Sequence, residues 1–217
     1  MATLSLLSFN SCIPDGQGEK QGQDEESISE KEFETVPDSL AEEGFDDFRI
    51  VPRASVLQWR GERISGEGHQ GTVDVASGNI RVRDQRIEGG QIWLDMTSMK
   101  ETGEEREEET SSVVMGYLHS QRFFDTEKFP KALLTIKGES QGMLLADLKI
   151  KDNTRAVMIP FNKSISGDTL RAGGSFAIDR TKWGLTYRSA GQTKDLGSLV
   201  IKDSIFFRTK VVAITGK

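Results

Sequence analysis

The stretch Gly116-Tyr-Leu-His-Ser-Gln-Arg-Phe-Phe-Asp-Thr-Glu-Lys-Phe-Pro130 is the part of the chain on which the fold assignment depends. It does not alternate apolar and polar residues for long, as a strand would, and its final proline ends any helix within it. It nevertheless contains His119, the adjacent Phe123 and Phe124, and Phe129, so it is too apolar for an ordinary exposed loop. We predict a compact, partly helical connection that closes or lines part of a β-rich domain.

Period-two alternation and turn-forming residues flank this stretch on both sides. The alternation predicts strands at residues 55–60, 67–75, 79–83, 91–97, 131–138, 142–151, 154–162, 169–179 and 200–214, with a turn at residues 88–90. Thr110, Ser111 and Ser112 can cap a short helix over residues 113–119. About eight to nine short strands with little helix indicate an antiparallel sandwich or barrel. Eight strands is roughly the size at which a barrel can enclose one small ligand.

Charge is distributed unevenly along the chain. Thirteen acidic and two basic residues lie between Asp15 and Asp47, a local net charge of −11, which leaves +5 for residues 48–217 against −6 for the whole chain. We therefore predict a disordered acidic linker at residues 13–47 and a folded domain at residues 48–217. The folded part lacks a dense cluster of lysine and arginine, so we do not expect a nucleic-acid partner.

Cys12 is the only cysteine, so an internal disulfide is excluded. It follows a short apolar run and small residues, which is typical of the end of a bacterial lipoprotein signal. In this interpretation residues 1–12 are the remnant of a signal peptide and Cys12 carries the lipid. The protein is then expected in the bacterial cell envelope, tethered to a membrane on the periplasmic side. Because no basic segment precedes the apolar run, an untargeted N-terminus with an incidental cysteine stays open.

The usual signatures of catalysis are weak in this sequence. Its two histidines, His69 and His119, are fewer than the three protein ligands of a typical catalytic zinc site. No Gly-x-Ser-x-Gly elbow or phosphate-binding loop occurs. Asp179 beside Arg180 is either a catalytic acid with a charge partner or a strand-end turn held by a salt bridge. We expect a protein that is not an enzyme and that has neither a metal nor a cofactor, apart from a bound lipid.

Apolar residues on the predicted strands outnumber those that one ordinary sheet face requires. The inward candidates are Ile92, Leu94, Met96, Leu134, Ile136, Phe161, Phe176, Ile178, Phe206 and Phe207. They either fill the core of a barrel or line a cavity within it, and barrels of this size do both.

Three segments carry a family resemblance, and they occur in the order that the family shows. Leu118-His-Ser-Gln-Arg-Phe-Phe-Asp-Thr-Glu-Lys-Phe-Pro130 resembles a His-Leu-x-Ser-x-x-Phe-Phe-Asp-x-x-x-Tyr-Pro pattern, although here the leucine precedes the histidine. Ala146-Asp-Leu-Lys-Ile-Lys-Asp-Asn-Thr154 resembles Gly-x-Leu-Thr-Ile-x-Gly-x-Thr, and Phe176-Ala-Ile-Asp-Arg-Thr-Lys-Trp-Gly184 resembles Ile-Asp-Arg-x-x-Trp/Phe-Gly. With Trp59-Arg-Gly61 and Gly68-His-Gln-Gly71, they make residues 53–213 similar to the YceI family, bacterial lipocalin-like proteins associated with polyisoprenoid binding.

The resemblance implies an all-β fold: an eight-stranded antiparallel lipocalin-like barrel with one short helix, holding a long apolar, isoprenoid-type ligand in its interior. It also implies export to the periplasm or envelope and suggests a homodimer. Polar groups from His119, Arg122 or Arg180 would orient the head group of the ligand. The ligand-binding residues predicted on this basis are Ile92, Leu94, Met96, Leu118, His119, Phe123, Phe124, Leu134, Ile136, Phe176, Ile178 and Trp183.

Two other functions stay open at this point. The same barrel with a filled core would act as a structural or interaction protein of the cell envelope, through its surface or its acidic linker. Alternatively, a hydrolase would use His119 with a carboxylate or a serine.

Overall fold

The computed structural model describes residues 44–102, 108–191 and 197–215. Cys12, the interpreted signal at residues 1–12 and the acidic linker as far as residue 43 lie outside this part of the chain. The described elements are β1 (Asp46–Ile50), η2 (Pro52–Ala54), β2 (Val56–Arg63), β3 (Gly68–Arg83), β4 (Arg86–Glu101), α1 (Glu108–His119), β5 (Lys131–Ser140), β6 (Met143–Ile150), β7 (Asn153–Ser166), β8 (Thr169–Asp179), η3 (Arg180–Trp183), η4 (Gly197–Leu199) and β9 (Ile201–Thr215).

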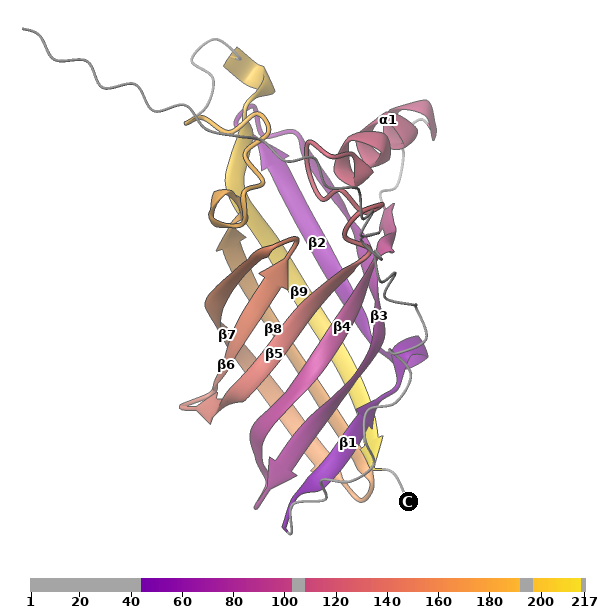
Figure 1. Ribbon diagram of the computed structural model, residues 1–217, viewed down its shortest axis with the longest axis vertical. Helices are drawn as coiled ribbons and strands as arrows, with labels where there is room; N and C mark the ends of the chain where they lie inside the picture. The colour runs from indigo at the N-terminus through magenta and orange to yellow at the C-terminus, as the bar shows by residue number, and fades with distance from the viewer. Residues whose placement is uncertain (1–43, 103–107, 192–196, 216–217) are drawn as a thin grey trace, which may run out of the picture. The chain divides into compact units, whose positions relative to one another are not determined.

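Nine strands among the described residues occupy eight positions of a closed antiparallel barrel (Figure 1). From β2 to β9, each strand pairs with the next along the chain, and β9 returns to pair with β2. β1 and β2 share one position: both lie between β3 and β9, with β1 against the end of β3 and β2 against its beginning. The short η2 helix separates the two. The prediction of an eight-stranded antiparallel barrel with one helix is confirmed.

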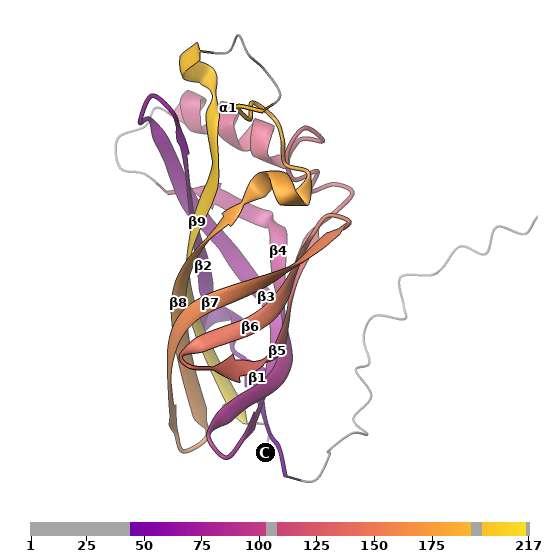
Figure 2. The ribbon, with the colours of Figure 1, turned by 90° about the vertical axis from the view of Figure 1, so that its left-hand side faces the viewer.

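Among the described residues, the helices that follow β4 gather at one end of the barrel. Figure 2 shows α1, η3 and η4 gathered there, and we call it the helix end. Helix α1 ends at His119, as predicted, but begins at Glu108, so that Thr110–Ser112 lie within the helix instead of capping it. Glutamate is a good helix former and is favoured in the first turn, which explains the earlier start.

The sequence interpretation placed a turn at residues 88–90, and this is wrong. These residues lie inside β4, and the hairpin between β3 and β4 turns at Asp84 and Gln85, whose φ angles are +49° and +64°. The predicted strands at residues 67–75 and 79–83 are likewise one continuous strand, β3.

Close approach of β3 to β4 explains these errors. A Cβ atom on Gly78 would lie 2.3 Å from the carbonyl oxygen of Gln91, and one on Gly90 would lie 2.3 Å from that of Asn79. Both glycines also have positive φ angles, +155° and +139°. They therefore let two long strands bend and pair closely, a role that glycine has in strands as well as in turns.

Gly71 in β3 makes a third close approach, and alanine at this position is expected to destabilise the barrel. Its Cβ atom would lie 2.0 Å from the carbonyl oxygen of Lys100 and 2.7 Å from the indole of Trp59. Because a backbone atom must move, we expect Gly71→Ala to lower the free energy of unfolding by about 1–3 kcal/mol in urea denaturation. Gly61→Ala is the control, since nothing lies within 4 Å of its added Cβ. An equal loss in both variants would contradict this account.

Two clusters of buried side chains fill much of the barrel. The first lies toward the helix end and includes Trp59, Phe123, Phe124 and Trp183. The second lies toward the opposite end and contains mainly aliphatic residues of β1 and of β3–β9. Leu94, Leu134, Val157 and Phe176 are only partly buried and pack against both clusters. The interior is therefore continuous from one end to the other.

Phe206 does not face this interior, contrary to the sequence interpretation. Its side chain is 49% exposed, whereas the neighbouring Phe207 packs against the first cluster and lies 5.3 Å from Phe176, ring centroid to ring centroid. Successive side chains of a strand point to opposite faces, so only one of two adjacent phenylalanines can point inward.

Candidate functional site

A largely apolar cavity runs through the barrel, and both core clusters contribute to its wall. The space open to the centre of a water molecule is about 210 Å³, whereas a site for one water needs only about 10–15 Å³. The cavity is therefore far larger than a packing defect. Its wall reaches the helix end, where α1, the beginning of β9 and residues 187–188 contribute side chains.

Nine of the twelve residues predicted from the sequence line this cavity: Ile92, Leu94, Met96, Leu118, Phe123, Phe124, Leu134, Ile136 and Phe176. Alternation places the residues of β4, β5 and β8 on the inner face. The turn after α1 places Phe123 and Phe124 inward, with their rings edge to face and 4.9 Å between centroids. That these residues bind a ligand stays a prediction.

Ile178 and Trp183 lie beside the cavity instead of on its wall. Both are buried in the first core cluster. The indole Nε1 of Trp183 donates a hydrogen bond to the carbonyl oxygen of Leu148, 3.0 Å away, which joins η3 to β6. Their position indicates a role in holding the helix end together.

His119 also lies outside the cavity wall. Its Nδ1 is 2.9 Å from the hydroxyl oxygen of Thr126, a buried residue in the turn that follows α1. Within the described residues, no carboxylate contacts His119 as a catalytic pair would require. Arg122 is exposed and does not line the cavity either, so Arg180 is the only one of the three predicted polar contacts that reaches the wall.

Sequence reasoning missed a second group of cavity residues. On β2 and β3 these are Leu57, Trp59, Val73 and Val75, and period-two alternation could have found them. At the helix end they are Tyr117, Tyr187 and Arg188. Tyr187 and Arg188 follow η3 in an irregular segment, so no periodic signal marks them.

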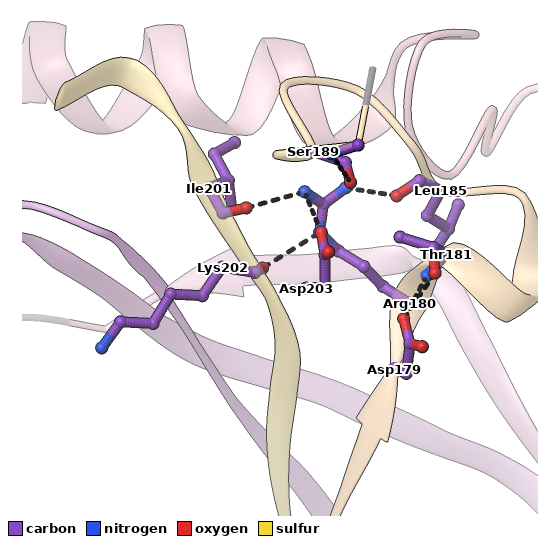
Figure 3. A network of polar contacts seen from close by, with 9 residues as sticks. Asp179, Arg180, Thr181, Leu185, Ser189, Ile201, Lys202 and Asp203 are labelled. Carbon is purple, nitrogen blue, oxygen red and sulfur yellow. Dashed lines mark hydrogen bonds and ion pairs between the residues drawn. The ribbon is translucent and has the colours of Figure 1, made fainter. Parts of the chain in front are cut away.

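Arg180 is fully buried at the helix end and joins the segment after β8 to the beginning of β9 (Figure 3). Its Nε donates to the carbonyl oxygen of Lys202 at 3.1 Å, its Nη2 donates to that of Ile201 at 3.0 Å, and its Nη1 donates to that of Leu185. Nη2 also lies 3.3 Å from Oδ1 of Asp203, without hydrogen-bond geometry. Burial lowers the pKa of the Arg180 guanidinium, and the charge of Asp203 opposes that shift.

Asp179 does not form the salt bridge that the sequence suggested. Its carboxylate accepts hydrogen bonds from the hydroxyl group of Thr181 at 2.6 Å and from the backbone N–H of Thr181 at 3.0 Å, so it caps η3. The hydroxyl hydrogen bond is the main reason that the pKa of Asp179 lies below its ordinary value. The strand-end turn is therefore present, but Arg180 takes Asp203 as its ion-pair partner.

A model of the YceI-like domain matches residues 48–213. The chain belongs to the YceI family. Its barrel is similar to the crystal structure of BcnA from Burkholderia cenocepacia, with 15% identity and a TM-score of 0.58 over 76% of this chain and 99% of that chain. It is also similar to a polyisoprenoid binding domain from Saccharophagus degradans implicated in plant cell wall breakdown, with 14% identity and a TM-score of 0.61 over 78% and 98%. No curated protein sequence matches the chain.

Charged groups of this YceI barrel gather where the cavity wall reaches the helix end. Glu62 accepts a hydrogen bond from Lys202 at 2.8 Å and pairs with Arg60 at 2.6 Å. The hydrogen bond from Lys202 is the largest of the effects that hold the pKa of Glu62 below its ordinary value. Nearby, His69 Nδ1 lies 2.7 Å from a carboxylate oxygen of Glu101.

The described part of the YceI domain provides no evidence for a metal site or for a membrane-spanning helix. It contains no group of three histidine, cysteine or acidic residues placed to hold a metal ion. In the same part of the chain, no helix is long and apolar enough to cross a membrane.

Proposed function

We propose that this YceI barrel holds a long apolar lipid of the isoprenoid type in its interior, as a non-enzymatic protein of the bacterial cell envelope. The observation that carries the proposal is the cavity, whose wall is continuous through both core clusters. Each methylene group that leaves water for such a wall contributes about 0.8 kcal/mol. The similar domain from Saccharophagus degradans is described as polyisoprenoid binding, which supports the same class of ligand here.

The envelope location rests on the sequence around Cys12 and on the family. A lipid on Cys12 would keep the barrel close to a membrane, with the residues between Cys12 and the start of β1 at Asp46 as the tether. The cavity counts against the alternative of a structural barrel with a filled core. A homodimer and the absence of catalysis stay predictions from the amino-acid sequence.

Trp59 provides a direct test of lipid binding. It lines the cavity, whereas Trp93 and Trp183 do not. We expect a long-chain prenol added to delipidated protein to change the tryptophan fluorescence in a saturable manner, because a tail in the cavity replaces solvent or empty space beside this indole. The change should be lost in Trp59→Phe, which keeps the other two tryptophans.

Native mass spectrometry of protein purified from its source is the complementary measurement. We expect an added mass that organic extraction releases as a lipid. If no lipid copurified, and added prenols changed neither the fluorescence of Trp59 nor the melting temperature, the proposed function would be wrong.

A further inference from the structure

Tyr117, Tyr187 and Arg188 form a compact group on the cavity wall at the helix end. The two tyrosine rings are stacked, with 5.8 Å between centroids and 19° between planes. The guanidinium carbon of Arg188 lies 5.2 Å from the centroid of the Tyr187 ring and 6.0 Å from that of Tyr117. These separations allow cation–π attraction, so the side chain of Arg188 is held against two aromatic faces.

The backbone also fixes Arg188. Its φ angle is +51°, which is uncommon for a residue with a side chain. The N–H of Ser189 donates to the carbonyl oxygen of Thr186 at 2.9 Å, and the N–H of Ile201 donates to that of Arg188 at 2.9 Å. Residues held in such a conformation persist where the surroundings impose it, and they cluster at binding sites.

Arg188 differs from the other charged side chains of the cavity wall in having no ionic partner within the described part of the chain. Each of the other charged side chains on the wall, and His69 with them, contacts a partner. The pairs are Glu62–Lys202, Arg63–Glu67, His69–Glu101 and Arg180–Asp203. Among the described residues, nothing accepts a hydrogen bond from the guanidinium of Arg188 or forms an ion pair with it. Arginine has five N–H donors, and the half-buried Arg188 has no acceptor for them among the described residues.

We infer that Arg188 binds the head group of the lipid, and that this head group is an oxyanion, a phosphate or a carboxylate. The planar guanidinium matches both groups in bidentate geometry. The stacked rings of Tyr117 and Tyr187 fix its orientation and shield one side from water, while the apolar wall beyond them takes the tail. This inference rests on the proposed function, and it adds the chemical class of the polar end.

Farnesyl phosphate and farnesol test it, because they share one tail and differ only at the head. Calorimetric titration of the delipidated full-length protein should give tighter binding of farnesyl phosphate by roughly ten- to a hundredfold, the range for a hydrogen-bonded charge pair. Arg188→Gln should remove this preference by weakening the binding of farnesyl phosphate far more than that of farnesol. Arg188→Lys should retain part of it. Lys182→Gln is the control, because Lys182 is an exposed residue of η3 that does not line the cavity. This variant removes one positive charge at the helix end and should keep the preference for farnesyl phosphate.

The outcomes separate the two proposals. Equal binding of the two ligands by the wild type, or a preference that survives in Arg188→Gln, overturns the head-group site but leaves lipid binding intact. Binding of neither ligand overturns the proposed function itself. Inorganic phosphate alone should not bind measurably. If it bound as tightly as farnesyl phosphate, the site would be an anion site without a lipid, and the inference would be wrong.

Discussion

Replacement of Arg180 by alanine is expected to lower the free energy of unfolding by about 3–5 kcal/mol, because several buried acceptors lose their donor at once. Arg180 has no exposed surface and donates to the carbonyl oxygens of Leu185, Ile201 and Lys202. Urea denaturation followed by far-ultraviolet circular dichroism measures the loss. Arg180→Lys should recover only a small part of it, since a single ammonium group cannot reach three carbonyl groups in different directions.

The matched control separates the hydrogen bonds from the ion pair. Asp203 is 40% exposed and contacts Arg180 without hydrogen-bond geometry, so we expect Asp203→Asn to cost less than about 1 kcal/mol. Arg171→Ala, at an exposed position of β8, controls for the loss of one positive charge. A loss in Asp203→Asn as large as that in Arg180→Ala would show that the ion pair, and not the carbonyl contacts, holds the helix end together.

Side-chain alternation was the part of the sequence that predicted the site best. Ile92, Leu94 and Met96 follow one another at every second position, and all three line the cavity. The rule needs only the period of a strand, so it works without knowledge of neighbours. It also shows why Phe206 was misplaced: two adjacent phenylalanines look equally apolar, and only the register of β9 decides which one faces inward.

Features that depend on neighbouring strands could not be predicted in this way. Gly90 is of a residue type that is common in turns, but the nearby carbonyl oxygen of Asn79 on the adjacent strand determines its role. Arg188 gives no sequence signal at all, because its place on the cavity wall depends on the irregular segment that follows η3. The contacts of Arg180 with the beginning of β9 help to fix where that segment runs.

Filling the part of the cavity beside the second core cluster is expected to have the largest effect on binding. Ala172 of β8 lines the cavity and packs beside the second core cluster. A phenylalanine ring at this position that displaced roughly four methylene groups of a bound tail would weaken binding by roughly two hundredfold, at about 0.8 kcal/mol for each group. The added ring enters the cavity and not a closely packed region, so we expect the free energy of unfolding without ligand to change by less than about 1.5 kcal/mol.

Ala177→Phe is the control for this variant, because Ala177 lies on the same strand but is exposed on the outer face. It carries the same added ring and should bind farnesol, measured by calorimetry, as tightly as the wild type. Normal binding in Ala172→Phe would mean that the tail does not pass this point of the barrel. If both variants lost binding equally, the cause would be a general disturbance of β8. Only selective loss in Ala172→Phe, with stability kept, places the tail inside the barrel and distinguishes a hollow binding protein from a structural barrel.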